Sequence, residues 1–227
     1  MSSVKFSTPQ QGFSLIEMAI VLVILGMLLG GMLMPLSSQR EVSQRQATER
    51  QLQEIRNALI GYAQANNRLP CPTISGTGAA ASVAGACPVG GTYVPYGALG
   101  IQGTIINGNL VDVWQQPIRY RLANPAPVAW VYANSPIPSA LAAATVPLPY
   151  FQICAAAGAC PVADAGNVVA VVFSTGSNDH VDSVGEIQNK SLATNNFVRR
   201  TLELNFNDII VWISQPTLIY ELSQNGQ

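Results

Sequence analysis

The chain has 227 residues, of which 48% are hydrophobic and 10% are charged, and this composition excludes an intrinsically disordered protein. A formal net charge of −1 leaves no excess of lysine and arginine for a phosphate backbone, so no nucleic-acid partner is expected. The length suits one ordinary domain, or one domain with a membrane anchor.

The first predicted element is an apolar run without a charged residue between Met18 and Gln39. About 20 helical residues cross the roughly 30 Å hydrocarbon core of a bilayer. A buried core helix usually has a polar face, which this run lacks. A cleaved secretory signal needs a small-residue cleavage site, and residues 30–40 contain none. The pattern therefore predicts a transmembrane helix over residues 13–36, after a short polar leader over residues 1–12.

A single carboxylate, Glu17, lies four residues into the hydrophobic run that begins at Phe13. At the centre of a membrane such a group costs about 2.5–3.5 kcal/mol on insertion scales, so it is a functional candidate by default. Inside a bundle of like helices the charge is tolerable if it faces a cation, such as the N-terminal amine of a neighbouring chain.

The segment Gln11-Gly12-Phe13-Ser14-Leu15-Ile16-Glu17 resembles the processing site of type IV pilins and type II secretion pseudopilins. In that family a prepilin peptidase cuts after the glycine and methylates the new N-terminal residue. The resemblance implies cleavage between Gly12 and Phe13, a methylated Phe13, and pairing of Glu17 with the Phe13 amine of a neighbouring subunit during assembly.

The same resemblance implies where the chain lies and what it meets. It places the leader in the cytoplasm and the remainder outside the inner membrane as a single-pass protein with a periplasmic head. Its partners would be prepilin peptidase, other pilin or pseudopilin subunits, the inner-membrane assembly platform and membrane lipid. Charges that flank the apolar run add little to this orientation, since Lys5 precedes it and Arg40 and Arg45 follow it.

An amphipathic helical pattern follows Pro35, with apolar residues at helical spacing at Leu52, Ile55, Leu59 and Tyr62. We predict one helix from Ser14 to about Ala65, because Pro70 forbids its continuation. Residues 37–69 would form a helical stem. Gly26, Gly30, Gly31 and Pro35 are either points where the helix bends or small residues that let helices approach closely.

Residues 70–227 are predicted to form a globular head with an α+β fold, in which the long N-terminal α-helix packs on a mostly antiparallel β-sheet. The strand-like runs are Ile118–Leu122, Val128–Tyr132, Tyr150–Cys154, Val168–Phe173 and Ile209–Ile213. A short closing helix is expected after Ser214, with Ser214 as its cap and Leu218, Ile219 and Leu222 facing inward.

The head contains all four cysteines, Cys71, Cys87, Cys154 and Cys160, and they form no C-x-x-C motif. Disulfides are therefore expected in place of a zinc or redox site, and three pairings are possible. Proximity in the sequence favours Cys71 with Cys87 and Cys154 with Cys160. An oxidising periplasm agrees with such bonds.

Two head segments resemble the major pseudopilin of type II secretion. Residues Asp112–Tyr120 are similar to its Asp-Pro-Trp-Gly-Asn-Pro-Tyr-x-Tyr segment, although Val113 and Gln115 replace the proline and the glycine. Residues Ser174–Asp182, with Asn207-Asp208-Ile209, are similar to its ligand loop and closing Asp-Asp-Ile, which bind calcium in that family.

This second resemblance implies a calcium site with Asp179, Asp182 and Asp208 as ligands, because hard cations prefer oxygen. The spacing is not that of an EF-hand, and Asn207 stands where a second acid is expected. The alternative is a polar turn in which Gly176, Ser177 and Asn178 permit the backbone geometry. No other cofactor is expected.

No catalytic residue is predicted, because His180 is the only histidine and no nucleophile motif lies near it. The resemblance of the N-terminal segment makes a structural subunit of a type IV pilus or type II secretion pseudopilus the preferred function, and not an enzyme. The alternative is a membrane-anchored or filament-tip binding or enzymatic head on a pilin-type stem.

Overall fold

The computed structural model describes residues 12, 14–32, 35–74, 87, 90–123, 150–160, 163–177, 182–201 and 206–224, with the backbone alone at 29–32 and 35–38. The predicted strand Val128–Tyr132 and the predicted ligand Asp179 lie outside these residues. The chain divides into two compact units, Met1–Ser43 and Gln44–Gln227. Each unit is described by itself.

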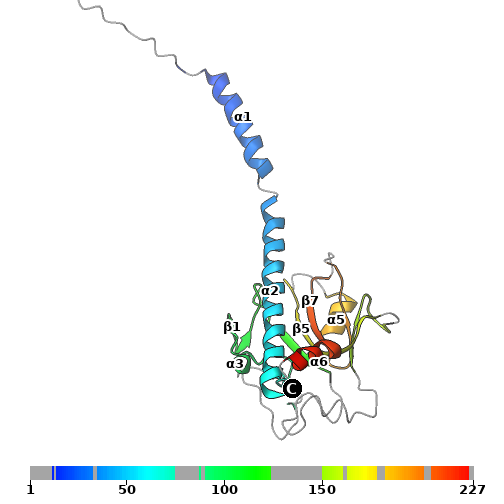
Figure 1. Cartoon of the computed structure of the whole chain (residues 1–227). Coiled ribbons are helices and arrows are strands. Elements are labelled where there is room, and N and C mark those ends of the chain that lie inside the picture. The colour runs from blue at the N-terminus through cyan, green and yellow to red at the C-terminus, as the bar shows by residue number, and fades with distance from the viewer. Residues whose placement is uncertain are drawn as a thin grey trace, which may run out of the picture. The chain divides into compact units, whose positions relative to one another are not determined.

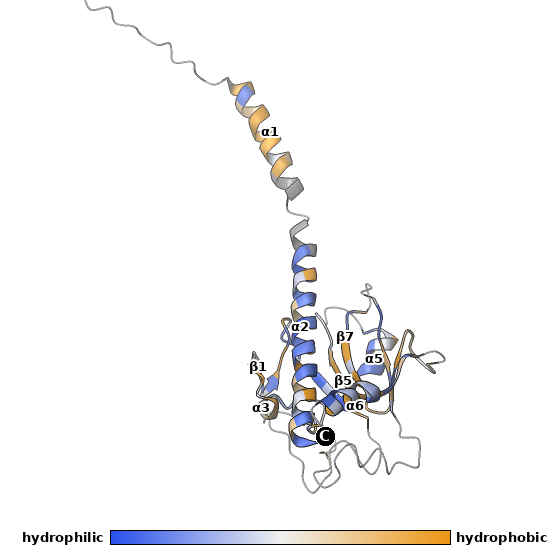
Figure 2. Cartoon of the chain, in the orientation of Figure 1, coloured by the Kyte–Doolittle hydropathy of each residue, from blue (hydrophilic) through white to orange (hydrophobic). Residues whose placement is uncertain are grey.

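The first unit contains helix α1 (Leu15–Met32), and helix α2 (Pro35–Asn66) begins in it (Figure 1). Most of the described residues of α1 are apolar (Figure 2), as the uncharged run predicts. Pro35 begins α2, a position where the missing proline N–H is not needed. The single helix that the sequence predicts is described as two helices, α1 and α2. Its predicted end near Ala65 agrees with the end of α2 at Asn66.

The part of α2 that belongs to the second unit packs on the sheet. Leu52, Ile55, Leu59 and Ala63 are fully buried at helical spacing, and Leu218 and Leu222 of helix α6 (Gln215–Gln224) join them in one core cluster. As predicted, Ser214 accepts a hydrogen bond from the backbone N–H of Thr217 (3.3 Å) at the start of α6. The inward placement predicted for Ile219 is wrong, because this residue follows Leu218 around the helix and is exposed.

A five-stranded sheet forms the centre of this unit, and the α+β prediction is confirmed. Its strands are β3 (Arg119–Leu122), β4 (Phe151–Cys154), β5 (Ala163–Ser174), β6 (Asn196–Val198) and β7 (Ile209–Ser214). All pairings are antiparallel except the parallel pairing of β4 with β6.

Strand β5 is the axis of the sheet, and β3 and β4 share one of its edges. Val168 pairs with Phe151 of β4 and with Ser214 of β7, so β4 and β7 lie on opposite edges of β5. Ala170 likewise pairs with β3 and with β7. Therefore β3 and β4 follow one another along the edge opposite β7, as two parts of an interrupted strand.

The two faces of the sheet bury different clusters. One face packs against α2 and α6, and the other carries the aromatic rings of Phe151, Phe173 and Phe197 in edge-to-face contact. Helix α5 (Val184–Lys190) precedes β6 and contacts it. A short helix α3 (Tyr96–Leu99) and a hairpin of β1 (Ile105–Ile106) and β2 (Asn109–Leu110) lead to the sheet.

Candidate functional site

The predicted processing segment lies at the start of α1, where the described residues are Gly12 and those from Ser14 onward; Phe13 is outside the described part. Gly12 is exposed, and a Cβ added there would meet nothing within 4 Å. Packing within the chain therefore does not require a glycine at this position. A requirement for Gly12 would come from whatever recognises the segment.

Glu17 lies in the first turn of α1, which Ser14 caps. The Ser14 carbonyl accepts hydrogen bonds from the backbone N–H groups of Glu17 (3.0 Å) and Met18 (3.2 Å), so the helix begins at this residue. A negative charge in the first turn is favoured by the helix dipole. The side chain of Glu17 is exposed, and so can meet a partner outside the chain.

The described side chains of α1, from Leu15 to Leu28, are not covered by other described residues of this unit. Leu15 is 92% exposed and Met27 is 75% exposed, and the residues between them are exposed as well. An apolar helix that exposes all its faces needs other helices or lipid around it. Within the described ranges, no helix combines the length and hydropathy of a membrane-spanning segment.

In the second unit, the segment that resembles the pseudopilin turn is closed by the carboxylate of Asp112. Asp112 Oδ1 accepts from the backbone N–H groups of Trp114 (2.8 Å) and Gln116 (2.9 Å), and Oδ2 accepts from the hydroxyl of Ser174 at the end of β5. Burial raises the pKa of Asp112, and these hydrogen bonds oppose that rise. Gln115 adopts φ +64°, the left-handed conformation that glycine favours.

A second turn, after β5, packs against the chain before β7. Gly176 has φ +63°, and a Cβ there would lie 2.7 Å from the carbonyl oxygen of Asn207. The Asn207 backbone N–H donates to Glu186 Oε1 (2.8 Å), and Glu186 Oε2 accepts from the Ser183 N–H (2.8 Å). One buried glutamate of α5 thus links the helix start to the residues that lead into β7.

We call the carboxylates of Asp182, Glu186 and Asp208, which lie around α5, the acidic junction. Asp182 Oδ1 lies 2.6 Å from Lys190 Nζ, and Asp208 Oδ2 accepts from Asn189 Nδ2 (2.8 Å). Burial raises the pKa of Asp208 to about 7; the charges of Glu186 and Asp182 add to the rise, whereas Lys190 and the Asn189 hydrogen bond oppose it.

The predicted calcium site stays a prediction, because its ligand Asp179 lies outside the described residues. A calcium ion takes six to eight oxygen ligands, roughly 2.3–2.6 Å away. Here Asp182 already binds an ammonium group, and Asp208 Oδ2 faces an N–H donor. In the part of the chain that the structure describes, no three His, Cys, Asp or Glu side chains are grouped as a metal ion would require.

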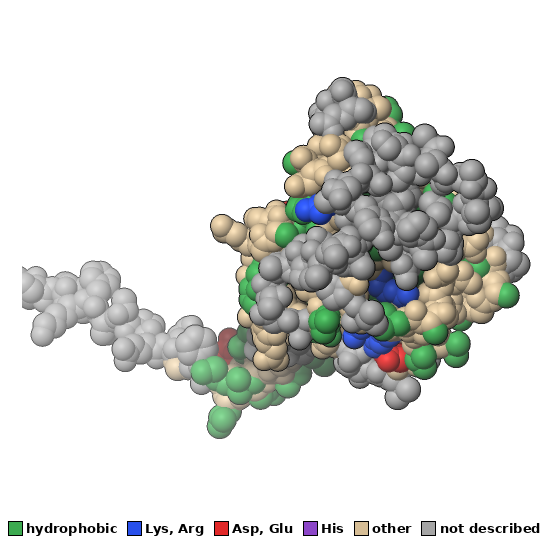
Figure 3. Space-filling view, turned by 90° about the horizontal axis from the view of Figure 1, so that it is seen from below, with side chains coloured by type: hydrophobic (Ala, Val, Ile, Leu, Met, Phe, Trp, Pro, Cys, Tyr) green, Lys and Arg blue, Asp and Glu red, His purple; other side chains and the backbone are tan. Residues whose placement is uncertain are grey.

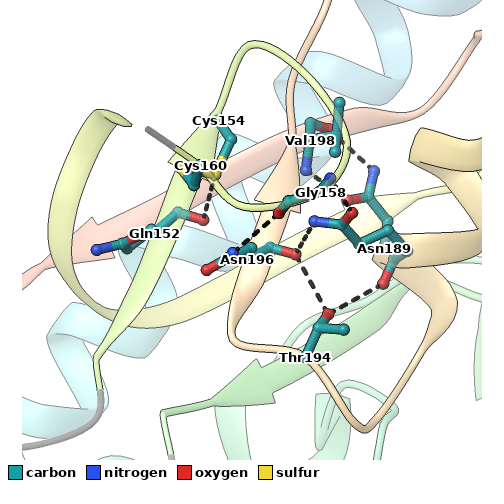
Figure 4. Close-up of a disulfide and its surroundings, with 9 residues drawn as sticks. Gln152, Cys154, Gly158, Cys160, Asn189, Thr194, Asn196 and Val198 are labelled. Carbon is teal, nitrogen blue, oxygen red and sulfur yellow. Dashed lines mark hydrogen bonds between the residues drawn. A yellow bond between two sulfur atoms is a disulfide. The ribbon is translucent and has the colours of Figure 1, made fainter. Parts of the chain in front are cut away.

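The structure contains two disulfides, Cys71–Cys87 and Cys154–Cys160, the pairing that sequence proximity favours. The second closes a short loop after β4 (Figure 4). The backbone of Gly158 in this loop donates to Gln188 Oε1 (2.8 Å) and accepts from Asn196 Nδ2 (3.2 Å). The loop is therefore held by the disulfide to its own strand and by hydrogen bonds to α5 and β6.

A groove of about 990 Å³ runs between α2 and β7 in the second unit. It is lined by charges of both signs: Arg45, Glu49, Arg50 and Glu54 from α2, with Arg199 and Arg200 after β6. The face of the molecule in Figure 3 likewise shows a few charged side chains among uncharged ones. Such a mixed surface differs from the basic patch that a nucleic-acid backbone needs.

Sequence reasoning missed Glu186, Lys190 and the buried cation Arg121. Arg121 donates to the carbonyl of Ser191 (2.6 Å), and its guanidinium lies over the neighbouring rings of Phe151 and Phe197, 5.1 Å from each centroid. Burial lowers its pKa to about 10. A signal did exist for Glu186, because serine followed three residues later by glutamate is a capping box.

Comparison with known proteins bears on the N-terminal end of the chain. Residues 7–33 match the family model described as the prokaryotic N-terminal methylation motif. This motif is the hallmark of the prepilin-type signal of type IV pilins and pseudopilins. Comparison with curated proteins and with solved structures finds no match. The motif supports a pilin-like or pseudopilin-like subunit that prepilin peptidase processes and that assembles with other pilin subunits.

Proposed function

We propose that the chain is a structural subunit of a type II secretion pseudopilus or a type IV pilus, and that it is not an enzyme. Prepilin peptidase cuts after Gly12 and methylates Phe13. The processed subunit remains in the inner membrane as a single-pass protein, with its head in the periplasm. It then enters a filament through α1.

The observation that carries this proposal is the exposed apolar surface of α1, directly after a methylation motif. Apolar helices can pack against one another in many registers at similar free energy. A carboxylate among them favours one register, because its burial is costly unless a cation lies beside it. Glu17 is that carboxylate, and the Phe13 amine of a neighbouring subunit is the cation. A subunit whose register is wrong leaves both charges unpaired.

The head supports the placement outside the cytoplasm, since its two disulfides suit an oxidising compartment.

Of the two filament types we favour the secretion pseudopilus. The Asp112 turn keeps the left-handed backbone at Gln115, where the pseudopilin segment has glycine. The groove beside β7 is an open surface lined by arginines and carboxylates, and suits contacts between subunits better than catalysis.

The first experiment is a mass measurement on the native chain together with a Glu17→Ala strain. We expect a chain that begins at Phe13 with one added methyl group. In Glu17→Ala, processing is retained while filaments fall by about tenfold or more, since a loss of about 1.4 kcal/mol per contact already changes an equilibrium tenfold. Electron microscopy of sheared filaments gives the count.

The matched control is Glu41→Ala, which removes an exposed carboxylate farther along the helical region. It should leave both processing and filament number unchanged. An intact Met1, or normal filaments in Glu17→Ala, contradicts the proposal. A strain without the chain separates the two filament types: loss of protein secretion with surface pili retained supports the pseudopilus, and the reverse supports the pilus.

A further inference from the structure

We propose that the side-chain amides of α5 stand in for a strand at the outer edge of β6, and that Asn189 keeps this edge closed to a second copy of the chain. The inference concerns the described residues of the head alone. It does not depend on the proposed function, which rests on α1.

Strand β6 ends the sheet of described strands, and its neighbour in that sheet is β4. The Arg199 N–H donates to the Cys154 carbonyl (2.9 Å), and the Asn195 carbonyl accepts from β4 as well. Because the backbone groups of successive residues in a strand point to opposite sides, those of Asn196 and Val198 point away from β4. Outward groups of this kind are a template for pairing with another chain.

Asn189 meets both outward backbone groups of Val198 (Figure 4). Its Oδ1 accepts from the Val198 N–H (2.7 Å), and its Nδ2 donates to the Val198 carbonyl (2.9 Å). These are the two hydrogen bonds that a residue of a neighbouring antiparallel strand would exchange with Val198. Nδ2 also donates to Asp208 Oδ2 (2.8 Å), and this bond fixes the orientation of the amide.

The other outward residue, Asn196, is met in a similar way. Its carbonyl accepts from Gln188 Nε2 (3.0 Å) and from the hydroxyl of Thr194 (3.3 Å). Both outward carbonyls of β6 and the Val198 N–H therefore have side-chain partners, which come from α5 and from the connection that follows it.

The composition of α5 fits this role. Its buried residues include Gly185 and Asn189, whereas Val184 is 73% exposed and Ile187 is 57% exposed. A helix that packs on a protein core normally buries its apolar side chains. Here the buried face is polar because it faces backbone groups. Gly185 lets the helix come close to β6, since a Cβ there would lie 3.1 Å from Val198 Cγ1.

The other outer strands of the sheet are met by different means. At β3, the Tyr120 N–H donates to the backbone carbonyl of Thr92 (2.7 Å). At β7, the Trp212 carbonyl accepts from Arg56 Nε (2.9 Å). A guanidinium only donates, whereas an amide offers a donor and an acceptor together, as a strand residue does. Asn189 can therefore satisfy an N–H and a carbonyl of the same residue.

The test compares the full chain in detergent with Asn189→Leu, which is similar in size but removes the donor and the acceptor. In the variant, the Val198 amide should exchange about tenfold faster by NMR, a change that corresponds to about 1.4 kcal/mol. The Arg199 amide, which bonds to β4, should change less. Analytical ultracentrifugation should show more association than for the wild type, since the opened edge can pair with a second copy.

Asn195→Leu is the matched control, because it places the same apolar side chain at an exposed position beside β6 and leaves Asn189 in place. It should associate like the wild type. Equal acceleration of the Val198 and Arg199 amides overturns the inference. So does an Asn189→Leu variant that associates no more than Asn195→Leu.

If Asn189→Leu does not fold, amide exchange in the wild type decides. A Val198 amide that exchanges as slowly as the Arg199 amide supports the inference, because an outward amide of an open edge strand is not protected. A Val198 amide that exchanges at the rate of an exposed amide overturns it.

Discussion

Gln115 shows how a residue with a side chain can hold the left-handed backbone of a turn. Its left-handed conformation places the N–H groups of Trp114 and Gln116 toward the Asp112 carboxylate. A residue with a Cβ occupies this conformation at a cost of roughly 1–2 kcal/mol. The hydrogen bonds to Asp112 offset that cost, so this turn holds a left-handed residue other than glycine.

Gln115→Gly should therefore stabilise the head by about 0.5–1 kcal/mol, which is the relieved strain less the larger entropy that glycine loses on folding. Chemical unfolding of the full chain in detergent measures the difference. Gln116→Gly is the control, because Gln116 is not among the residues with positive φ and should only lose stability. Equal effects of the two substitutions would show that Gln115 carries no strain.

The raised pKa of Asp208 predicts how the stability of the folded chain depends on pH. An unfolded aspartate has a pKa near 4, whereas burial raises the pKa of Asp208 to about 7 in the folded chain. The folded state therefore binds the proton more tightly. The stabilisation that comes from protonated Asp208 is fully present below about pH 4 and is lost as the pH rises through about 7.

Asp208→Asn should remove this loss and make the chain more stable than the wild type at pH 8, by on the order of a few kcal/mol. Urea unfolding at pH 5 and pH 8 compares the two chains. Asp164→Asn, at an exposed position, should leave the pH dependence as it is in the wild type. A pH dependence that persists unchanged in Asp208→Asn would contradict the assignment.

At the scale of elements, the sequence predicts those whose signal is local. The four strand runs that fall within described residues each overlap an observed strand, because β-branched and aromatic residues bounded by turn residues indicate strands. Strand β6 (Asn196–Val198) is too short for such a pattern. Helix α5 was also missed, although its capping box was readable, because only seven residues follow the cap.

The interrupted strand of β3 and β4 was not predictable, since its continuity exists only in the pairing with β5. Ala123 still donates to the carbonyl of Val169, and Phe151 pairs with the next position, Val168. Ala123 and Phe151 thus meet the same edge of β5 at adjacent positions.

A short glycine-serine linker in place of residues 125–148 should therefore leave the sheet intact. The closure entropy of a loop changes by only about 0.6 kcal/mol for each doubling of its length, so the melting temperature should change by a few degrees at most. Circular dichroism and thermal melting measure this. A chain that fails to fold would show that the replaced segment is part of the core, whereas the same linker inserted between Val171 and Val172 should abolish folding.

At the scale of the whole molecule, the two units differ in what sequence can predict about them. The processing segment and α1 depend on contiguous residues, and both a family model and simple hydropathy recognise them. The acidic junction joins segments around positions 176, 186 and 207, which only the topology of the sheet brings together. Its lysine could not be assigned before the fold was known, and the calcium expectation followed from resemblance alone.

Both disulfides close loops between near neighbours, 16 and 6 residues apart, and the two loops neither overlap nor enclose one another. Each bridge can therefore form as soon as its own segment meets an oxidant, in either order and without waiting for the remainder of the chain. The two bonds therefore impose no order on the folding of the remainder of the chain.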